Sequence, residues 1–229
     1  MEHVSRVQDG GPTLIRLLAH LGGIAPPSPS QAPSSHLAHW IDWRHAVALA
    51  AALESRATAS SVDPVPAPED EEECAHVRAT LARSIDGDRA FADARQAGGA
   101  ADAGFYRQRC VTLQQVMGAE VALLRKRLRE RLSRRSAPLA RLAAVDAVME
   151  QALAPRERAL LAAVPEAVAR HFERSRDTHE GDRDAAMPWL DAFRRNMRTL
   201  LFAELDLRLQ PIRGLSAALR TDIAGHHAE

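Results

Sequence analysis

Apolar residues recur at every third or fourth position along most of this 229-residue sequence. In the stretch 105–135, the residues at this spacing are Leu113, Val116, Met117, Val121, Leu124, Leu128 and Leu132. Such spacing places side chains on one face of an α-helix, whereas a half-buried strand alternates with a period of two, and no segment here does so over a useful length. Aromatic residues make up only 4% of the chain, and alanine, leucine and arginine recur throughout, which favours helices over strands. The sequence therefore predicts an all-α protein.

Prolines divide this pattern into separate helices. Pro138, Pro155 and Pro188 stand where helices are expected to begin, because the first helical residue needs no N–H group. Pro165 is expected to kink or restart a helix, and Pro211 to end or bend one. With the capping signals, this predicts helices over residues 13–21, 34–55, 105–135, 138–153, 155–174 and 188–211, one that begins inside the acidic run 69–73, and a short last helix that carries Leu215 and Leu219.

The composition changes along the chain suggest how it is organised. Residues 1–57 form an N-terminal helical module, residues 58–73 an acidic linker rich in Pro and Ser, and residues 74–229 the main helical bundle; the alternative is one continuous domain over residues 1–224. Long helices joined by short connections pack antiparallel. We therefore expect a helical bundle with a long antiparallel hairpin in the middle of the chain.

Composition and motifs exclude several classes of function. The chain has 30 basic and 30 acidic residues, and a formal charge of zero argues against a protein that coats nucleic acid or membrane over its whole surface. Its longest apolar run, Ala46–Leu53, is far shorter than the ~20 residues that span a bilayer. Two cysteines, Cys74 and Cys110, fit a reducing cytoplasm. Because no nucleophile, phosphate-loop or Cys-x-x-Cys motif is present, we expect no enzyme, no catalytic residue, no cofactor and no small-molecule substrate.

The strongest charge feature is a basic run between Arg125 and Arg135, in which Glu130 is the only acid. A basic helix can lie along phosphates or acidic lipid heads, and Arg127, Arg131 and Arg134 are the candidate contacts. At about 100° per residue, however, these positions fan around the helix, which favours a solvated or internally paired helix end. The acidic run Glu69–Glu73 is the counterpart that could pair with them, within the chain or between subunits.

Two tryptophans and a group of polar residues complete the candidates. Trp40 and Trp43 lie beside His36 and His39, a histidine pair at i, i+3 that could share a metal ion. No cysteine or carboxylate at ligand spacing completes that set, so histidines packed on tryptophan are the more common arrangement and no metal is expected. The candidate partner-binding residues are therefore Trp40 and Trp43 in the first module, the three arginines of the basic run, and Glu204, Asp206 and Arg208 near the end.

The two ends of the sequence resemble a known family. Residues 36–53, with Trp40 and Trp43, look like the opening motif of an uncharacterised proteobacterial family, domain of unknown function 3348, and residues 197–211, followed by Gly214-Leu215, look like its closing motif. The family has no assigned activity. The resemblance implies a gene context, since such proteins are similar to ones encoded near flagellar-motor-like or energy-transducing membrane proteins and OmpA-like envelope proteins; this is association and not mechanism.

Two functional hypotheses follow. The first is a cytoplasmic, non-enzymatic helical interaction or scaffold protein that has protein partners and serves as an accessory of a bacterial envelope or motor-like membrane complex. Self-association is expected because a narrow apolar stripe on so long a helix often needs a partner chain, although the regular heptads are too short for a parallel coiled coil. The alternative is a nucleic-acid-associated regulator that binds through Arg125–Arg135.

Overall fold

The part of the chain that the structure describes is helical, without a strand. The computed structural model describes residues 13–22, 41–54, 67–91, 102–179 and 188–226. Its elements are α1 (Thr13–Gly22), α3 (Trp43–Glu54), α4 (Ala67–Asp86), a 3₁₀ turn (Arg89–Phe91), α5 (Ala103–Arg135), α6 (Ala137–Thr178), α7 (Pro188–Arg208) and α8 (Gln210–His226). The predicted all-α class is confirmed.

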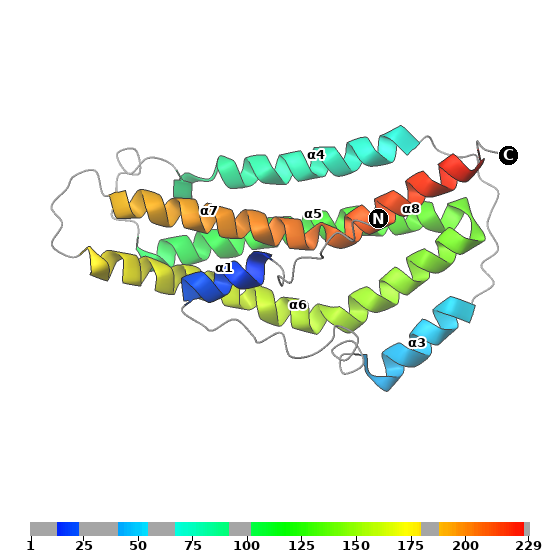
Figure 1. Cartoon of the computed structure of the whole chain (residues 1–229), viewed down its shortest axis with the longest axis horizontal. Helices are drawn as coiled ribbons and strands as arrows, with labels where there is room; N and C mark the ends of the chain where they lie inside the picture. The colour runs from blue at the N-terminus through cyan, green and yellow to red at the C-terminus, as the bar shows by residue number, and fades with distance from the viewer. Residues whose placement is uncertain (1–12, 23–40, 55–66, 92–101, 180–187, 227–229) are drawn as a thin grey trace, which may run out of the picture.

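Helices α5 and α6 form the long antiparallel hairpin that the apolar spacing predicted (Figure 1). Helix α5 begins after Asp102, whose carboxylate accepts a hydrogen bond from the Phe105 N–H at 2.7 Å and so caps the first turn. It continues to Arg135, and Ser136 alone connects it to α6. Because only one residue connects them, the two helices run antiparallel and pack side by side.

Helix α6 is one continuous helix of 42 residues, with Pro155 and Pro165 inside it. The prediction that Pro155 opens a new helix is wrong, and Pro165 does not restart one. Each proline lacks the N–H that would bond to the carbonyl four residues earlier, which bends a helix without having to end it. Figure 1 shows α6 bent between its two halves. Packing against α5 along this length outweighs the local signal of the prolines.

The buried side chains form one core that joins early and late parts of the chain. Helix α1 contributes Leu14, Leu18 and Leu21 to the same cluster as the hairpin and α7. Helix α3 packs mainly on α6 instead, and its buried Ala52 lies outside that cluster. The largest fully buried side chains of the cluster are Leu14, Leu81, Ile85, Tyr106, Met117, Leu124, Leu128, Leu132, Phe193, Met197, Leu200 and Leu201.

Helix α4 begins earlier than the sequence predicted. It starts at Ala67, two residues before the acidic run, so residues 67–73 of the expected linker are helical, while residues 58–66 lie outside the described part. Acidic residues in the first turns of a helix complement its dipole and favour this start. Helix α4 then packs along α5, α7 and α8.

Pro211 stands at the junction of α7 and α8, where a break or bend was predicted. Helix α7 ends at Arg208 and Pro211 is the second residue of α8. Backbone hydrogen bonds of 3.0 Å, from the Leu209 N–H to Leu205 and from the Arg213 N–H to Leu209, carry the helical ladder across the junction. The chain therefore changes direction here without leaving the bundle (Figure 1).

Two adjacent leucines of α5 test the assignment of the core. Leu124 is 0% exposed and Leu123 is 48% exposed. We expect Leu124→Ala to lower the free energy of unfolding by about 2–5 kcal/mol, because it leaves a cavity, and Leu123→Ala to lower it by less than about 1 kcal/mol. Urea unfolding followed by circular dichroism measures both. Equal effects of the two substitutions would contradict the described packing of α5.

Candidate functional site

Two hollows lie along one side of the α5–α6 hairpin. Val111, Gln115, Gly118, Ala122, Arg129 and Ser133 line them from α5, and their steps of three, four and seven residues place them on one face of that helix. The larger hollow has a volume of about 830 Å³ and is closed on its third side by Leu207, Arg208 and Pro211, at the junction of α7 and α8. We call the two hollows together the hairpin groove.

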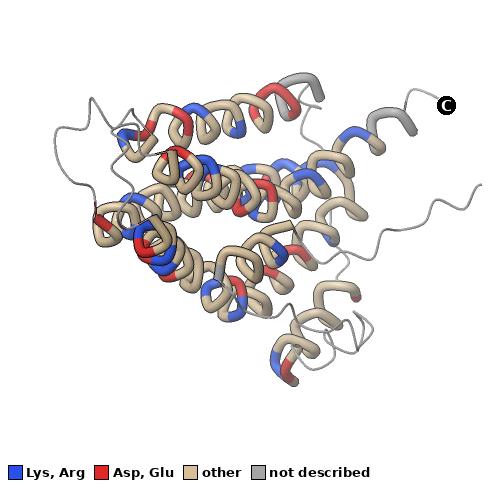
Figure 2. Tube along the Cα trace, turned by 60° about the vertical axis from the view of Figure 1, so that its left-hand side comes forward, with Lys and Arg blue, Asp and Glu red and all other residues tan. Residues whose placement is uncertain are grey.

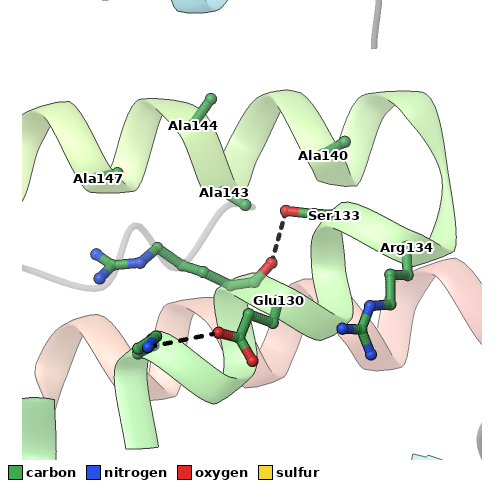
Figure 3. Close-up of a pocket in the computed structure, with 9 residues that line it drawn as sticks. Glu130, Ser133, Arg134, Ala140, Ala143, Ala144 and Ala147 are labelled. Carbon is green, nitrogen blue, oxygen red and sulfur yellow. Dashed lines mark hydrogen bonds and ion pairs between the residues drawn. The ribbon is translucent and has the colours of Figure 1, made fainter. Parts of the chain in front are cut away.

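The smaller hollow lies near the tip of the hairpin and has a volume of about 400 Å³. Figure 3 shows the residues that line it, with Glu130, Ser133 and Arg134 on α5 and a row of alanines on α6; of the three, Ser133 points toward α6. The α6 wall consists of Ala140, Ala143, Ala144 and Ala147. One wall is therefore polar and charged, and the other is small and apolar.

An ionic cluster crosses the groove between the two hollows. Arg125 lies 2.7 Å from Asp146, and Arg129 lies 2.5 Å from Glu150 and 3.2 Å from Asp146. The side chains of Arg125 and Asp146 are each 12% exposed, so these charges are largely withdrawn from solvent. Two arginines of the basic run thus hold α5 to α6.

A buried polar cluster forms the inner wall of the larger hollow. The Glu204 side chain is 0% exposed; its Oε2 accepts a hydrogen bond from Gln114 Nε2 at 2.8 Å, and its Oε1 accepts one from Arg208 Nε at 2.8 Å. Gln114 Nε2 also donates to the Leu161 carbonyl at 2.9 Å. Pro165 explains this last bond, because its missing N–H leaves that carbonyl without its usual helical donor.

Burial governs the protonation of this cluster. Desolvation is the main cause that raises the pKa of Glu204, while Arg208 and the hydrogen bond from Gln114 oppose it. Burial likewise raises the pKa of the nearby Cys110 thiol, and the charge of Glu204 adds to that shift. A thiol held in its neutral form is a poor nucleophile. Because the polar side chains of this cluster form hydrogen bonds with one another, we assign the cluster a structural role in the wall of the groove.

The acidic and basic runs of the sequence meet in the structure. Glu73 of α4 lies 2.7 Å from Arg127 and 2.5 Å from Arg131. The basic run therefore points to two sides, with Arg125 and Arg129 toward α6 and Arg127 and Arg131 toward α4. Arg134 is exposed and lines the smaller hollow.

The remaining predicted site residues are dispersed. Glu204 and Arg208 come together in the buried cluster, but Asp206 lies on another face of α7, where it contacts Arg213 at 2.6 Å and Arg78 at 3.4 Å. Trp43 is 80% exposed at the start of α3. Trp40, His36 and His39 lie outside the described residues. Within the described ranges, no group of three His, Cys, Asp or Glu side chains is placed to hold a metal ion.

Sequence reasoning missed Gln114 and Gly118. Gln114 joins three helices, and Gly118 lines the larger hollow, where an added Cβ would lie 3.5 Å from Arg208 Nη1. A signal for Gln114 existed, because a proline inside a long helix predicts an unpaired carbonyl that needs a donor from elsewhere. Nothing in the local sequence indicates which of the polar residues supplies it.

Fold and site define an all-helical bundle whose central hairpin carries an open groove. Across the residues that are described, none of the helices has an apolar stretch long enough to cross a membrane. The chain belongs to the family described as "Protein of unknown function (DUF3348)", whose model matches residues 1–221, and the resemblance of the two terminal motifs is thereby confirmed. No curated protein and no solved structure matches the chain.

Neighbouring glutamines of α5 test the buried cluster. Gln114→Ala removes the donor to both the Leu161 carbonyl and Glu204, and we expect it to lower the free energy of unfolding by about 1–3 kcal/mol. Gln115 is exposed, and Gln115→Ala should change stability by less than about 0.5 kcal/mol. Chemical unfolding of the two variants provides the comparison. A tolerated Gln114→Ala would show that the Leu161 carbonyl does not depend on this donor.

Glu204 predicts a particular dependence of stability on pH. Since its pKa is higher in the folded than in the unfolded protein, the folded protein binds the proton more tightly, and this contribution to stability falls as pH rises from about 4.5 through the raised pKa. The glutamine in the Glu204→Gln variant cannot ionise, so its stability lacks this pH-dependent contribution. The difference in free energy of unfolding, variant minus wild type, should therefore increase with pH over that window and stay constant above it.

Urea unfolding at a series of pH values measures this difference. The matched control is Asp206→Asn, which removes one negative charge two residues away, from a half-exposed side chain. If the difference between Glu204→Gln and wild type were independent of pH, Glu204 would not titrate in the way its burial implies.

Proposed function

We propose that this chain is a non-enzymatic helical interaction protein, a scaffold that binds a helix of a partner protein in the hairpin groove. The observation that carries the proposal is the groove itself, two hollows in line along the α5–α6 hairpin. Its walls combine apolar surface with charged side chains, among them Arg125 and Arg208, and such a combination is found where proteins take up an amphipathic helix.

The dimensions of the groove support a helical occupant. The two hollows and the ionic cluster between them extend along α5 from Val111 to Ser133, which corresponds to roughly 33 Å at 1.5 Å per residue. Packed helices lie about 8–10 Å apart, at the short end of this range where the contact residues are small. The alanine wall of α6 beside the smaller hollow permits such a close approach.

The lining also specifies the chemistry of the partner. Apolar residues of the partner helix would fill the larger hollow, beside Leu153, Leu160 and Leu207. Near the tip of the hairpin, Lys126 lies 3.9 Å from Glu130, and the exposed Arg134 favours an acidic residue on the partner. The expected occupant is therefore an amphipathic helix with acidic residues toward the hairpin tip.

The setting of the interaction is part of the proposal. We place the protein in the cytoplasm, as the two free cysteines suggest, and as an accessory of a bacterial envelope or motor-like membrane complex, as the gene context implied by the terminal motifs suggests. A scaffold in this position would contact its complex through the hairpin groove and associate with further copies of itself through another surface.

The alternative, binding of nucleic acid through Arg125–Arg135, receives less support from the geometry. Arg127 and Arg131 contact Glu73, and Arg125 and Arg129 contact Asp146 and Glu150, so phosphates would have to displace carboxylates. Lys126 and Arg134 remain at the surface, which is a small footprint compared with the phosphate contacts of typical nucleic-acid-binding proteins. We therefore favour the protein partner.

Two glycines provide a matched test of the groove. Gly118 lines the larger hollow, whereas a Cβ added at Gly214 on α8 meets nothing within 4 Å. Gly118→Leu should fill part of the groove and lower the amount of recovered complex with the partner by at least about tenfold. Gly214→Leu should leave the amount of recovered complex unchanged. Both substitutions remove a helical glycine, so their effects on helix propensity are comparable.

The measurement is photo-crosslinking in the native host. A photoreactive amino acid replaces the exposed Gln115, which lines the larger hollow, and crosslinked proteins are identified by mass spectrometry. Support requires a partner that the wild type and Gly214→Leu capture and Gly118→Leu does not, with unfolding curves that show all three folded. If Gly118→Leu captured the partner as well as the wild type does, or if no protein were captured at all, the groove would be refuted as the binding site.

A further inference from the structure

Helix α3 presents an apolar face to solvent. Trp43 is 80% exposed, Leu53 54% and Val47 49%, and these are three of the large hydrophobic side chains that the described surface leaves uncovered. Ala46, Ala50 and Ala51 are exposed among them. The opposite side of the helix, with the buried Ala52, packs on α6. Helix α3 lies at the edge of the bundle (Figure 1). It therefore turns an apolar face to solvent as well as one to α6.

Charge on this face is confined to the two ends of the helix. Arg44 and Glu54 are exposed, and the tube of α3 is uncharged between its ends (Figure 2). Asp42, just before the helix, has a different role, because it accepts a hydrogen bond from the His45 N–H at 2.9 Å and lies 2.7 Å from the His45 Nδ1. It caps the first turn, which leaves Arg44 as the exposed cation at this end.

We propose that α3 is the surface through which two copies of this chain associate, the two α3 helices packing antiparallel across a two-fold axis. In this arrangement Arg44 of each copy lies against Glu54 of the other. The inference depends on the self-association named in the proposed function, supplies its surface and register, and uses a part of the molecule other than the hairpin groove.

Charge complementarity selects the antiparallel orientation. Arg44 and Glu54 are ten residues apart, or roughly 15 Å along the helix axis, in both copies. Antiparallel pairing about the middle of the helix therefore forms both Arg44–Glu54 contacts at once, whereas parallel pairing would oppose arginine to arginine and glutamate to glutamate. The same register sets Trp43 of one copy near Leu53 of the other, and Val47 at the level of Ala51.

The residues of this face favour a second copy of the chain as its binding partner. A two-fold interface uses the same patch on both subunits, so the patch has to complement itself, and this one does, in charge as well as in apolar character. Homodimer interfaces are also more apolar than other interfaces and depleted of charge at their centre. The small Ala46 and Ala50 near the centre of the face permit close approach of the two helices.

Charge reversal tests both the surface and the register. Arg44→Glu alone places two carboxylates against each other at each end of the helix pair, and Glu54→Arg alone places two guanidinium groups there. Either substitution should weaken the dimer by about tenfold or more, since two contacts change from attraction to repulsion. The double variant Arg44→Glu/Glu54→Arg should recover the wild-type dimer. An equimolar mixture of the two single variants should form the mixed dimer in preference to either homodimer.

Analytical ultracentrifugation of the full chain measures the dissociation constants, and native mass spectrometry counts the mixed dimer. The matched control is Arg134→Glu, the same reversal at an exposed arginine of α5, which should leave the dimer unchanged. Trp43→Ala should dissociate the dimer without a change of charge. A wild type that stays monomeric at tens of micromolar, or a dimer that Arg44→Glu does not weaken and the double variant does not restore, would overturn the proposal.

The two proposals fail separately. A monomeric wild type removes the α3 pairing but leaves capture of a partner by the hairpin groove untouched. If Gly118→Leu captures the partner as well as the wild type does, while the dimer obeys the charge reversals, the groove is removed and the pairing is retained. Thermal unfolding of each variant distinguishes a lost interface from a lost fold.

Discussion

The hydrogen bond between Gln114 and the Leu161 carbonyl fixes the geometry on which the rest of the molecule depends. Pro165 deprives that carbonyl of its helical donor in the interior of α6, and Gln114 replaces the donor from α5 at 2.9 Å. The same amide donates to Glu204 of α7, which Arg208 binds from its other side. Three helices are thereby held at one point. Because Arg208 and Leu161 also line the larger hollow, the contact that satisfies the proline-containing helix is the one that shapes the groove.

Around α5, each side has its own partner. Arg127 and Arg131 face Glu73 on α4, Arg125 and Arg129 face Asp146 and Glu150 on α6, and Gln114 reaches α7. The basic run fans around its helix because it binds two neighbours, with arginines spaced by four residues serving each of them. These contacts hold α5 as the central helix of the bundle. The hairpin groove lies on a further side of α5, bordered by α6 and by the junction of α7 and α8, and it is where we place the helix of a partner.

Periodicity and capping were sufficient to predict most of the fold but little of the site. The apolar spacing of 105–135 identified α5 and the hairpin, because one buried face determines both the helix and its packing. Pro155 misled the prediction of α6, since the same residue type suits a first helical turn and a bent interior, and only packing along α5 decides between them. Glu204 and Arg208 were predicted only as separate partner-binding residues, and their mutual contact was not predicted. Gln114 lies 90 residues from Glu204, and no local pattern indicates such a contact.

The two proposed surfaces differ in ways that suit them to different partners. The face of α3 is apolar with one charge at each end, so it complements itself. The smaller hollow of the hairpin groove instead has alanines on one wall and charged residues on the other, which requires an occupant of different sequence. A dimer formed through α3 would carry two copies of the groove. Two linked grooves bind a partner that is itself repeated far more tightly than one groove does, because the second contact forms at the effective concentration set by the first. Self-association would thus convert a modest helix-binding site into a scaffold that selects assembled, multi-subunit complexes over their free subunits.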